Sequence, residues 1–227
     1  MINRHPHSFQ NTITVQKGHP IMAKTNRDVT VNGRLSFEHL FTPQAPNENA
    51  EPKYSATILI PKTDTATIGR VQAAITTAVA DGVERRVFKQ AIDPAQTKYP
   101  PLRDGDSLTD SGEPRGPEFA GCWFIAAKAG TKRKPFVVDG NLQPIIDESE
   151  VYSGCYINAA VQFFAYENSG NKGISASLVG VQKVKDGERL GGPALEAEDV
   201  FTALGTPAPA TGGFGQQAPA AAPSLGF

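Results

Sequence analysis

The fold class of this chain is decided by the stretch VYSGCYINAAVQFFAYENSGNKGISASLVGVQKV, residues 151–184. Its two arms, 151–167 and 173–184, are rich in β-branched and aromatic residues, which favour strands. The spacer ENSGNKG between them has the Asn and Gly content of a turn. The stretch therefore predicts a β-hairpin.

Further segments have the same strand composition, and they are residues 29–41, 54–60, 121–129 and 135–139. The first two are separated by PQAPNENAEP, a polar loop rich in Pro and Asn, and we interpret them as a hairpin with a long connection. Residues 93–117 are dominated by Gly, Pro, Asp and Ser, and loops of that length are usually associated with function or disorder.

One segment has helical periodicity. Between Asp64 and Lys89 the apolar residues recur every three to four positions, at Ile68, Val71, Ile75, Val79 and Val83. Thr63 or Asp64 can cap the helix at its start. Because the strands do not alternate with helices, the sequence predicts a mainly β fold, a closed or partly closed antiparallel barrel with one inserted α-helix.

The two ends of the chain differ from this middle part. Residues 1–22 lack periodicity and end at the second of two methionines, so we expect a disordered N-terminal extension. Residues 205–227 are mainly Ala, Gly, Pro and Gln, which predicts a flexible, disordered C-terminal tail. The folded domain is expected over residues 23–204.

Composition limits the class of protein. The 227 residues are 39% hydrophobic and 20% charged, as in soluble globular domains. No apolar run approaches the roughly 18 residues of a spanning helix, and we expect a cytoplasmic protein without membrane contact. Cys122 and Cys155 are expected to be buried free thiols, and no metal or other cofactor is predicted.

The charge is nearly balanced, with a formal net charge of −1. Three acidic residues and no Lys or Arg follow Leu190, whereas the leader before Met22 holds Arg4 and Lys17 and no acid. The span from Met22 to Leu190 is therefore neutral. Any nucleic-acid groove must be a local basic cluster, since such domains usually carry a basic excess.

One such cluster is present. Lys128, Lys132, Arg133 and Lys134 fall within seven residues without an acid, after the strand that bears Trp123 and Phe124 and before Phe136. Single-stranded nucleic acid needs cations for its phosphates and aromatic rings for its bases. The alternative interpretation is a solvated hairpin tip beside core aromatic residues. Further candidates are Lys53 with Tyr54, Lys62, Tyr99 with Lys98 and Arg103, and Lys183 with Lys185.

Neighbouring residues of a strand point to opposite faces. Of the two rings of Trp123 and Phe124, one therefore faces the barrel interior and the other faces outward. The same holds for Phe163 and Phe164. We place Trp123 on the outside.

Enzyme motifs such as a phosphate-binding loop or a nucleophile elbow are not found. Asp147, Glu148 and Glu150 could hold Mg²⁺ for phosphodiester cleavage, although three carboxylates in a polar loop are more often plain surface. A metal-dependent nuclease or DNA-processing enzyme is therefore the alternative function. A scaffold or virion protein that binds only proteins is a third.

Several segments resemble the single-stranded DNA-binding proteins of tailed bacteriophages, and they are PKYSATILIPK (52–62), GCWFIAAKA (121–129), residues 137–166 and GISASLVGVQKVKDGERL (173–190). The resemblance implies an oligonucleotide-binding (OB) fold that coats single strands without strong sequence preference during replication, recombination and repair in the infected bacterial cell. Proteins of this function often carry an acidic tail with an aromatic terminus that recruits replication proteins. Phe227 matches that terminus, but the preceding acidic run is missing.

The candidate residues for binding single-stranded DNA (ssDNA) are accordingly Lys53, Tyr54, Lys62, Tyr99, Arg103, Trp123, Lys128, Lys132, Arg133, Lys134 and Phe136. Phe227 is the candidate contact for phage replication proteins.

Overall fold

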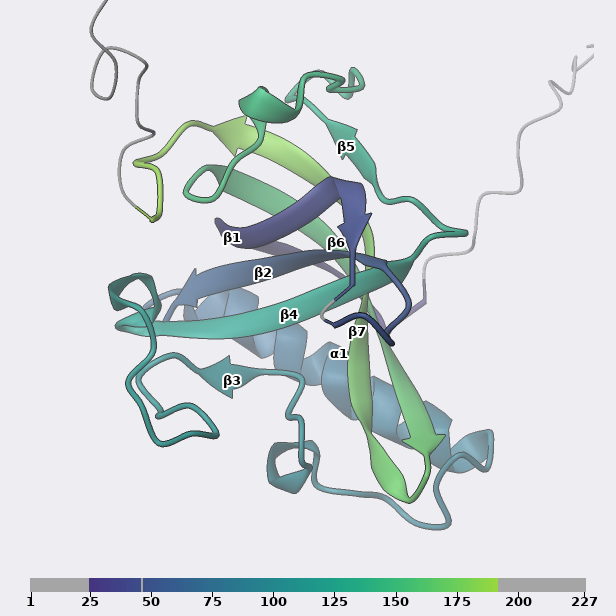
Figure 1. Cartoon of the computed structure of the whole chain (residues 1–227). Helices are drawn as coiled ribbons and strands as arrows, with labels where there is room; N and C mark the ends of the chain where they lie inside the picture. The colour runs from purple at the N-terminus through teal and green to yellow at the C-terminus, as the bar shows by residue number, and fades with distance from the viewer. Residues whose placement is uncertain (1–24, 46, 192–227) are drawn as a thin grey trace, which may run out of the picture. The chain divides into compact units, whose positions relative to one another are not determined.

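The structure, a computed structural model, describes residues 25–45 and 47–191 (Figure 1). Within this part the strands are β1 (Asp28–Gln44), β2 (Lys53–Pro61), β3 (Arg103–Asp104), β4 (Cys122–Gly130), β5 (Phe136–Val138), β6 (Tyr156–Asn168) and β7 (Asn171–Lys185). The α-helix is α1 (Thr65–Glu84), and three 3-10 turns are η1 (Pro94–Gln96), η2 (Pro117–Phe119) and η3 (Glu148–Glu150). The expected extension, tail and partner-binding residue Phe227 lie outside the described residues.

The strands close into a barrel. β1 pairs with β2 and β6, β2 with β4, and β6 with β7, all antiparallel. A parallel pairing of β4 with β7, at Ala127 opposite Ala176 and Lys128 opposite Ser177, closes the ring. β3 and β5 are added at the edges of β4 and β7. The predicted mainly β barrel with one inserted helix is confirmed, and its closing seam is parallel.

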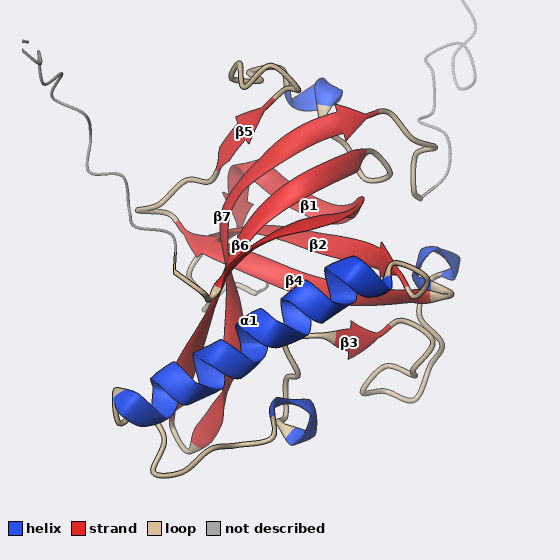
Figure 2. Ribbon diagram, turned by 180° about the vertical axis from the view of Figure 1, so that it is seen from behind, coloured by secondary structure: helices blue, strands red, loops and turns tan. Residues whose placement is uncertain are grey.

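Alternate residues of each strand fill the barrel. The inward side chains of β2 and β6 include Ile58, Ile60, Ile157 and Phe163, which are all at most 1% exposed. The apolar face of α1 packs against the barrel core. Figure 2 shows α1 from behind, lying across the strands of the barrel. The carboxylate of Asp64 accepts from the Thr67 backbone N–H at 3.0 Å, so the predicted cap is confirmed.

The predicted hairpin is confirmed, although its first arm begins later than predicted, at Tyr156 instead of residue 151, and its second arm is longer. β6 and β7 extend to Asn168 and Asn171, so the loop contains just Ser169 and Gly170. Both have positive φ, 49° and 81°, as the tight hairpin turns that match strand twist require. The helix, in contrast, ends earlier than predicted, at Glu84, where Arg85 forms its C-cap.

β1 contains a bulge that the sequence pattern does not reveal. Its register with β2 shifts between Ser36 and His39, and Phe37 between them has φ 46°. Alternation alone would place Phe37 inside together with Leu35. The bulge instead leaves the Phe37 side chain 60% exposed, whereas Leu35 is buried.

Both cysteines are free, as expected. Cys155 is buried and Cys122 is half-buried, and this burial raises the pKa of each thiol. No helix within the described residues is long and apolar enough to cross a membrane.

Candidate nucleic-acid interface

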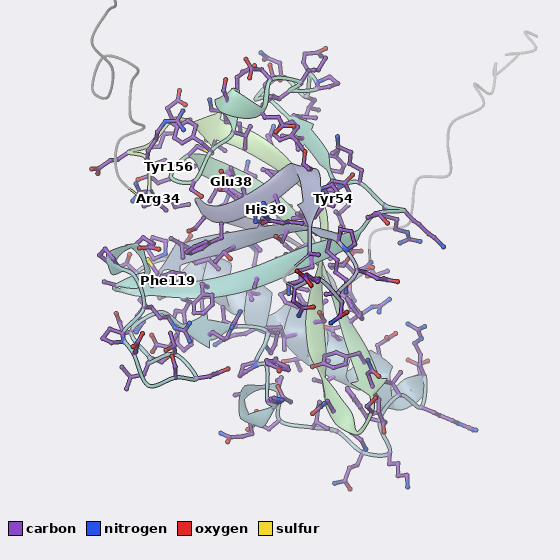
Figure 3. All side chains as sticks on the ribbon, in the orientation of Figure 1. Arg34, Glu38, His39, Tyr54, Phe119 and Tyr156 are labelled. Carbon is purple, nitrogen blue, oxygen red and sulfur yellow. The ribbon has the colours of Figure 1, made fainter. Side chains whose placement is uncertain are left out.

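The outer face of β1, β2 and β4 lies in front of α1 in Figure 1, and we call it the barrel face. Register places its residues in rows across the three strands, which are Arg34–Leu59–Phe124, Ser36–Thr57–Ala126, His39–Ser55–Lys128 and Gln44–Lys53–Gly130. The first row combines Arg34 with the apolar Leu59 and the aromatic Phe124. The second row has small side chains, and the last two rows carry Lys128 and Lys53. Figure 3 shows Phe119 near the first end and His39 further along.

Lys128 lies where three hollows of the surface meet. The first, about 430 Å³, is formed by the β1–β2 loop and also contains Lys53 and His39. The second, about 370 Å³, separates the segment from Tyr99 to Arg103 from the β6–β7 hairpin. The third, about 600 Å³, extends over the β4–β7 seam. Because Lys128 lines all three, the hollows form one connected surface, the Lys128 groove.

The Lys128 groove is locally cationic in a chain with no net excess of positive charge. The cations that line it are Lys53, Arg103, Lys128, Arg133 and Lys134. Among the described residues, Glu51 is the single acid in its lining. Aromatic rings of Tyr99, Tyr166 and Phe164 border it. A concave surface of one charge sign concentrates counter-ions and polyanions.

Three phenylalanines lie at the other end of the barrel face. The rings of Phe119 and Phe124 meet edge to face at 5.0 Å, and Phe119 lies 6.1 Å from Phe37 at an interplanar angle of 26°. With Leu59, Phe119 and Phe124 form a second small apolar cluster outside the barrel. The ring of Phe37 extends from this cluster into solvent.

Two guanidinium groups lie over the Phe124 ring. The Cζ of Arg103 is 4.5 Å from the ring centroid and the Cζ of Arg115 is 4.9 Å from it. Burial lowers the pKa of Arg103, and the charge of Arg115 lowers it further. Since Arg103 also lines the Lys128 groove, it connects the aromatic end with the cationic end.

Residues 27–210 match the family described as Enterobacter phage Enc34, ssDNA-binding protein. The chain belongs to the Enc34 family. It is 35% identical over 179 residues to "Putative protein p50" of Acyrthosiphon pisum secondary endosymbiont phage 1, covering 76% of this chain and 91% of that protein.

Two solved structures of the Enc34 family are similar to this barrel, and both are the single-stranded DNA-binding protein from bacteriophage Enc34. The complex with ssDNA is 28% identical, with a TM-score of 0.59 over 72% of this chain and 88% of that chain. The protein described without ssDNA is 28% identical, with a TM-score of 0.56 over 76% of this chain and 87% of that chain. The sequence resemblance to phage single-stranded DNA-binding proteins is thereby confirmed.

In this Enc34-family protein, the structure brings together six of the candidate residues that the sequence suggested. They line the Lys128 groove, and they are Lys53, Tyr99, Arg103, Lys128, Arg133 and Lys134. The Tyr99 ring is 51% exposed, with the Lys98 ammonium 5.2 Å from its centroid. Their contact with DNA stays a prediction.

Two aromatic candidates are placed elsewhere. Tyr54 is 8% exposed and belongs to the barrel core, so its ring has no face free for a base. Trp123 was expected on the outside, but it packs against the core beside Gln72 and Ile75 of α1. Phe124 is the ring on the outer side. The same alternation leaves Phe163 buried and Phe164 37% exposed.

Three further candidates do not line the Lys128 groove. The Lys62 ammonium forms ion pairs with Asp104 and Asp106, each at 2.7 Å, and its charge is thereby neutralised. Phe136 lies on β5 against Gly180, where an added Cβ would come within 2.4 Å of its ring. Lys132 is exposed at the tip of the loop after β4.

Sequence reasoning missed Phe37, Arg115 and Phe119. Arg115 and Phe119 belong to the segment RGPEF at the end of the long polar loop, whose length was the one available signal. Phe37 had no signal, because its exposure depends on the bulge in β1.

The acidic group suggested for the alternative function is not a metal centre. The Asp147 carboxylate caps η3 and accepts from the Ser149 backbone N–H at 2.9 Å and from the hydroxyl at 2.7 Å, and these bonds lower its pKa. Within the described residues, no three His, Cys, Asp or Glu side chains, these included, gather closely enough to hold a metal ion. The nuclease interpretation therefore loses its proposed centre.

Proposed function

We propose that this protein coats single-stranded DNA along the barrel face and the Lys128 groove, without strong sequence preference, in phage DNA replication, recombination and repair. The observation that carries the proposal is the convergence of three hollows on Lys128, with five cations and one acid among the described residues of their lining. The family match and the solved relative described as a complex with ssDNA support it. The expected place of action is the cytoplasm of the infected bacterium.

The chemistry of the groove suits a single strand. Ammonium and guanidinium groups neutralise phosphates, and exposed rings such as Tyr99 stack on bases, whatever the base. Phosphate contacts carry no sequence information. OB barrels present the face of their second and third strands and the adjoining loops to oligonucleotides. Here those strands are β2 and β4, and the Lys128 groove lies along them.

We further propose that binding is not followed by cleavage. The family supports a binding role, and Asp147 is engaged in capping η3. Labelled oligo-dT incubated with the protein and Mg²⁺ should remain intact over hours. Shortened products that form with Mg²⁺ but not in the presence of a chelator would show an enzyme instead.

The suggested contact of Phe227 with phage replication proteins stays a separate proposal, supported by the aromatic terminus alone. Deleting Phe227 should weaken capture of those proteins and leave oligo-dT affinity unchanged. Equal capture by both forms would contradict it.

Titration of fluorescently labelled oligo-dT at several salt concentrations tests the main proposal. Affinity should fall steeply with salt, because phosphate neutralisation releases counter-ions. Lys128→Gln should reduce the slope of log K against log salt by about 0.7, the value for one phosphate contact on a single strand. Lys89→Gln removes the same charge from an exposed position beyond α1 and should leave the slope unchanged. No binding of the wild type at low salt would contradict the function itself.

A further inference from the structure

Two positive charges lie near the Phe124 ring, and neither forms an ion pair with a described carboxylate. Arg103 and Arg115 both lie within 5 Å of its centroid. Among the described residues, neither guanidinium has a carboxylate oxygen within 4.0 Å. The Arg115 Nη2 donates to the Leu108 carbonyl at 3.3 Å, whereas its Nε is buried and has no partner.

This arrangement is electrostatically unfavourable without a ligand. Burial lowers the pKa of Arg103, and the nearby charge of Arg115 lowers it further. Asp110 opposes this effect, but as the smallest of the three causes. An anion that contacts both groups would offset their like charge, and guanidinium groups match phosphate oxygens in geometry.

We propose that Arg103 and Arg115 form a phosphate site for the backbone of the bound DNA strand. This inference rests on the proposed function and deepens it, because it fixes the path of the strand. Arg103 borders the Lys128 groove, and Phe119 and the exposed Phe37 lie on the other side of Phe124. The strand therefore runs from Lys128 past the arginine pair toward Phe37. Residues 124 and 128 of β4 are about 13 Å apart along the strand.

The loop that carries Arg115 is anchored at both ends. Lys62 bridges Asp104 and Asp106 at 2.7 Å, and the Asp106 carboxylate accepts from the Gly121 N–H at 2.8 Å. Gly105 lies so close to the returning chain that an added Cβ would come within 2.2 Å of the Phe119 carbonyl oxygen. The guanidinium of Arg115 is thus positioned before DNA arrives, which reduces the ordering needed on binding.

The test measures the salt dependence of oligo-dT binding by the full chain carrying Arg115→Gln. The slope of log K against log salt should fall by about 0.7. Affinity for oligo-dT and oligo-dC should fall by the same factor, because a phosphate contact does not read the base. Arg115→Lys keeps the charge and should retain most of the wild-type slope. Lys89→Gln is the control for the loss of one cation.

The possible outcomes separate the two proposals. Wild-type slopes for both Arg115→Gln and Arg103→Gln, in proteins that still bind oligo-dT, would overturn the phosphate site and leave the proposed function standing. Variants that melt at lower temperature but keep the wild-type slope would show that the arginines merely cover Phe124, which also overturns it. Failure of the wild type to bind oligo-dT at low salt would overturn both.

Discussion

Trp123 and Phe124 are adjacent in β4 but lie on opposite sides of the sheet. The Phe124 ring belongs to the barrel face and carries two guanidinium groups, whereas Trp123 packs beside α1. The single tryptophan of the chain therefore reports on the side away from the proposed DNA path.

Tryptophan emission should change little when oligo-dT binds, because Trp123 lies beside α1, on the side of the sheet away from the proposed DNA path. The measurement is a fluorescence titration run in parallel with anisotropy of labelled oligo-dT, which confirms saturation. Strong quenching at saturation would place the strand on the α1 side and contradict the proposed path.

The loop after β4 should contribute to binding through two of its three cations. Arg133 and Lys134 line the Lys128 groove, whereas Lys132 does not. Replacing both Arg133 and Lys134 by Gln should lower the slope of log K against log salt by about 1.4, twice the value for one contact. Lys132→Gln, from the same loop, is the matched control and should bind as the wild type does. If substitutions at all three positions have equal effects, the cations attract DNA through a general electrostatic field and not through contacts in a defined groove.

The side chain of Phe37 should contribute to DNA binding, whereas its backbone conformation should reduce the stability of the fold. Its ring is the exposed end of the phenylalanine cluster, and loss of one stacking ring weakens ssDNA binding by about 1–3 kcal/mol. Both Phe37→Ala and Phe37→Gly should therefore bind oligo-dT less tightly. Its φ of 46° strains a residue with a Cβ by about 1–2 kcal/mol, so the Gly variant should be the more stable of the two. Thermal melting compares them, and a Gly variant that melts below the Ala variant would contradict the strain.

The Lys62 bridge should give stability that depends on pH. Hydrogen bonds from Lys62 hold the pKa values of Asp104 and Asp106 below their ordinary value of 3.8, and those bonds raise the pKa of Lys62 above 10.5. The carboxylates' contribution is complete above their unfolded pKa and is lost as the pH falls through the lower folded values. Lys62→Gln should therefore lower the melting temperature at pH 7 and do so less at pH 3.

The comparison of melting temperatures at the two pH values needs a control variant that removes one positive charge at another position. Lys89→Gln should show a melting-temperature difference from wild type that is small at both pH values. A Lys62→Gln effect of equal size at pH 7 and pH 3 would mean that the ion pairs do not anchor the loop.

Local patterns in the sequence were sufficient for the helix and for every described strand except the short β3, which falls in the predicted loop 93–117. The β-branched and aromatic residues in 151–184 predicted the hairpin. The spacing of Ile68, Val71 and Ile75 predicted the helix, and Asp64 is one of the two residues predicted to cap it. The cationic run Lys128 to Lys134 also pointed to the end of β4 where the Lys128 groove lies. Such features depend on neighbours within a few residues, and those are visible in one dimension.

The sequence by itself thus determined the helix, the described strands other than β3, the cluster of positive charge and the family. Tertiary structure decided which of the two rings, Trp123 or Phe124, faces outward. Strand alternation shows only that the two rings point to opposite faces of the sheet, and it does not show which ring packs in the core. Closure of β4 against β7 brought Tyr99, Lys128 and the β6–β7 hairpin to one surface, and the bulge turned Phe37 into solvent. These outcomes depend on contacts between segments far apart in the chain, whose energies no local pattern encodes.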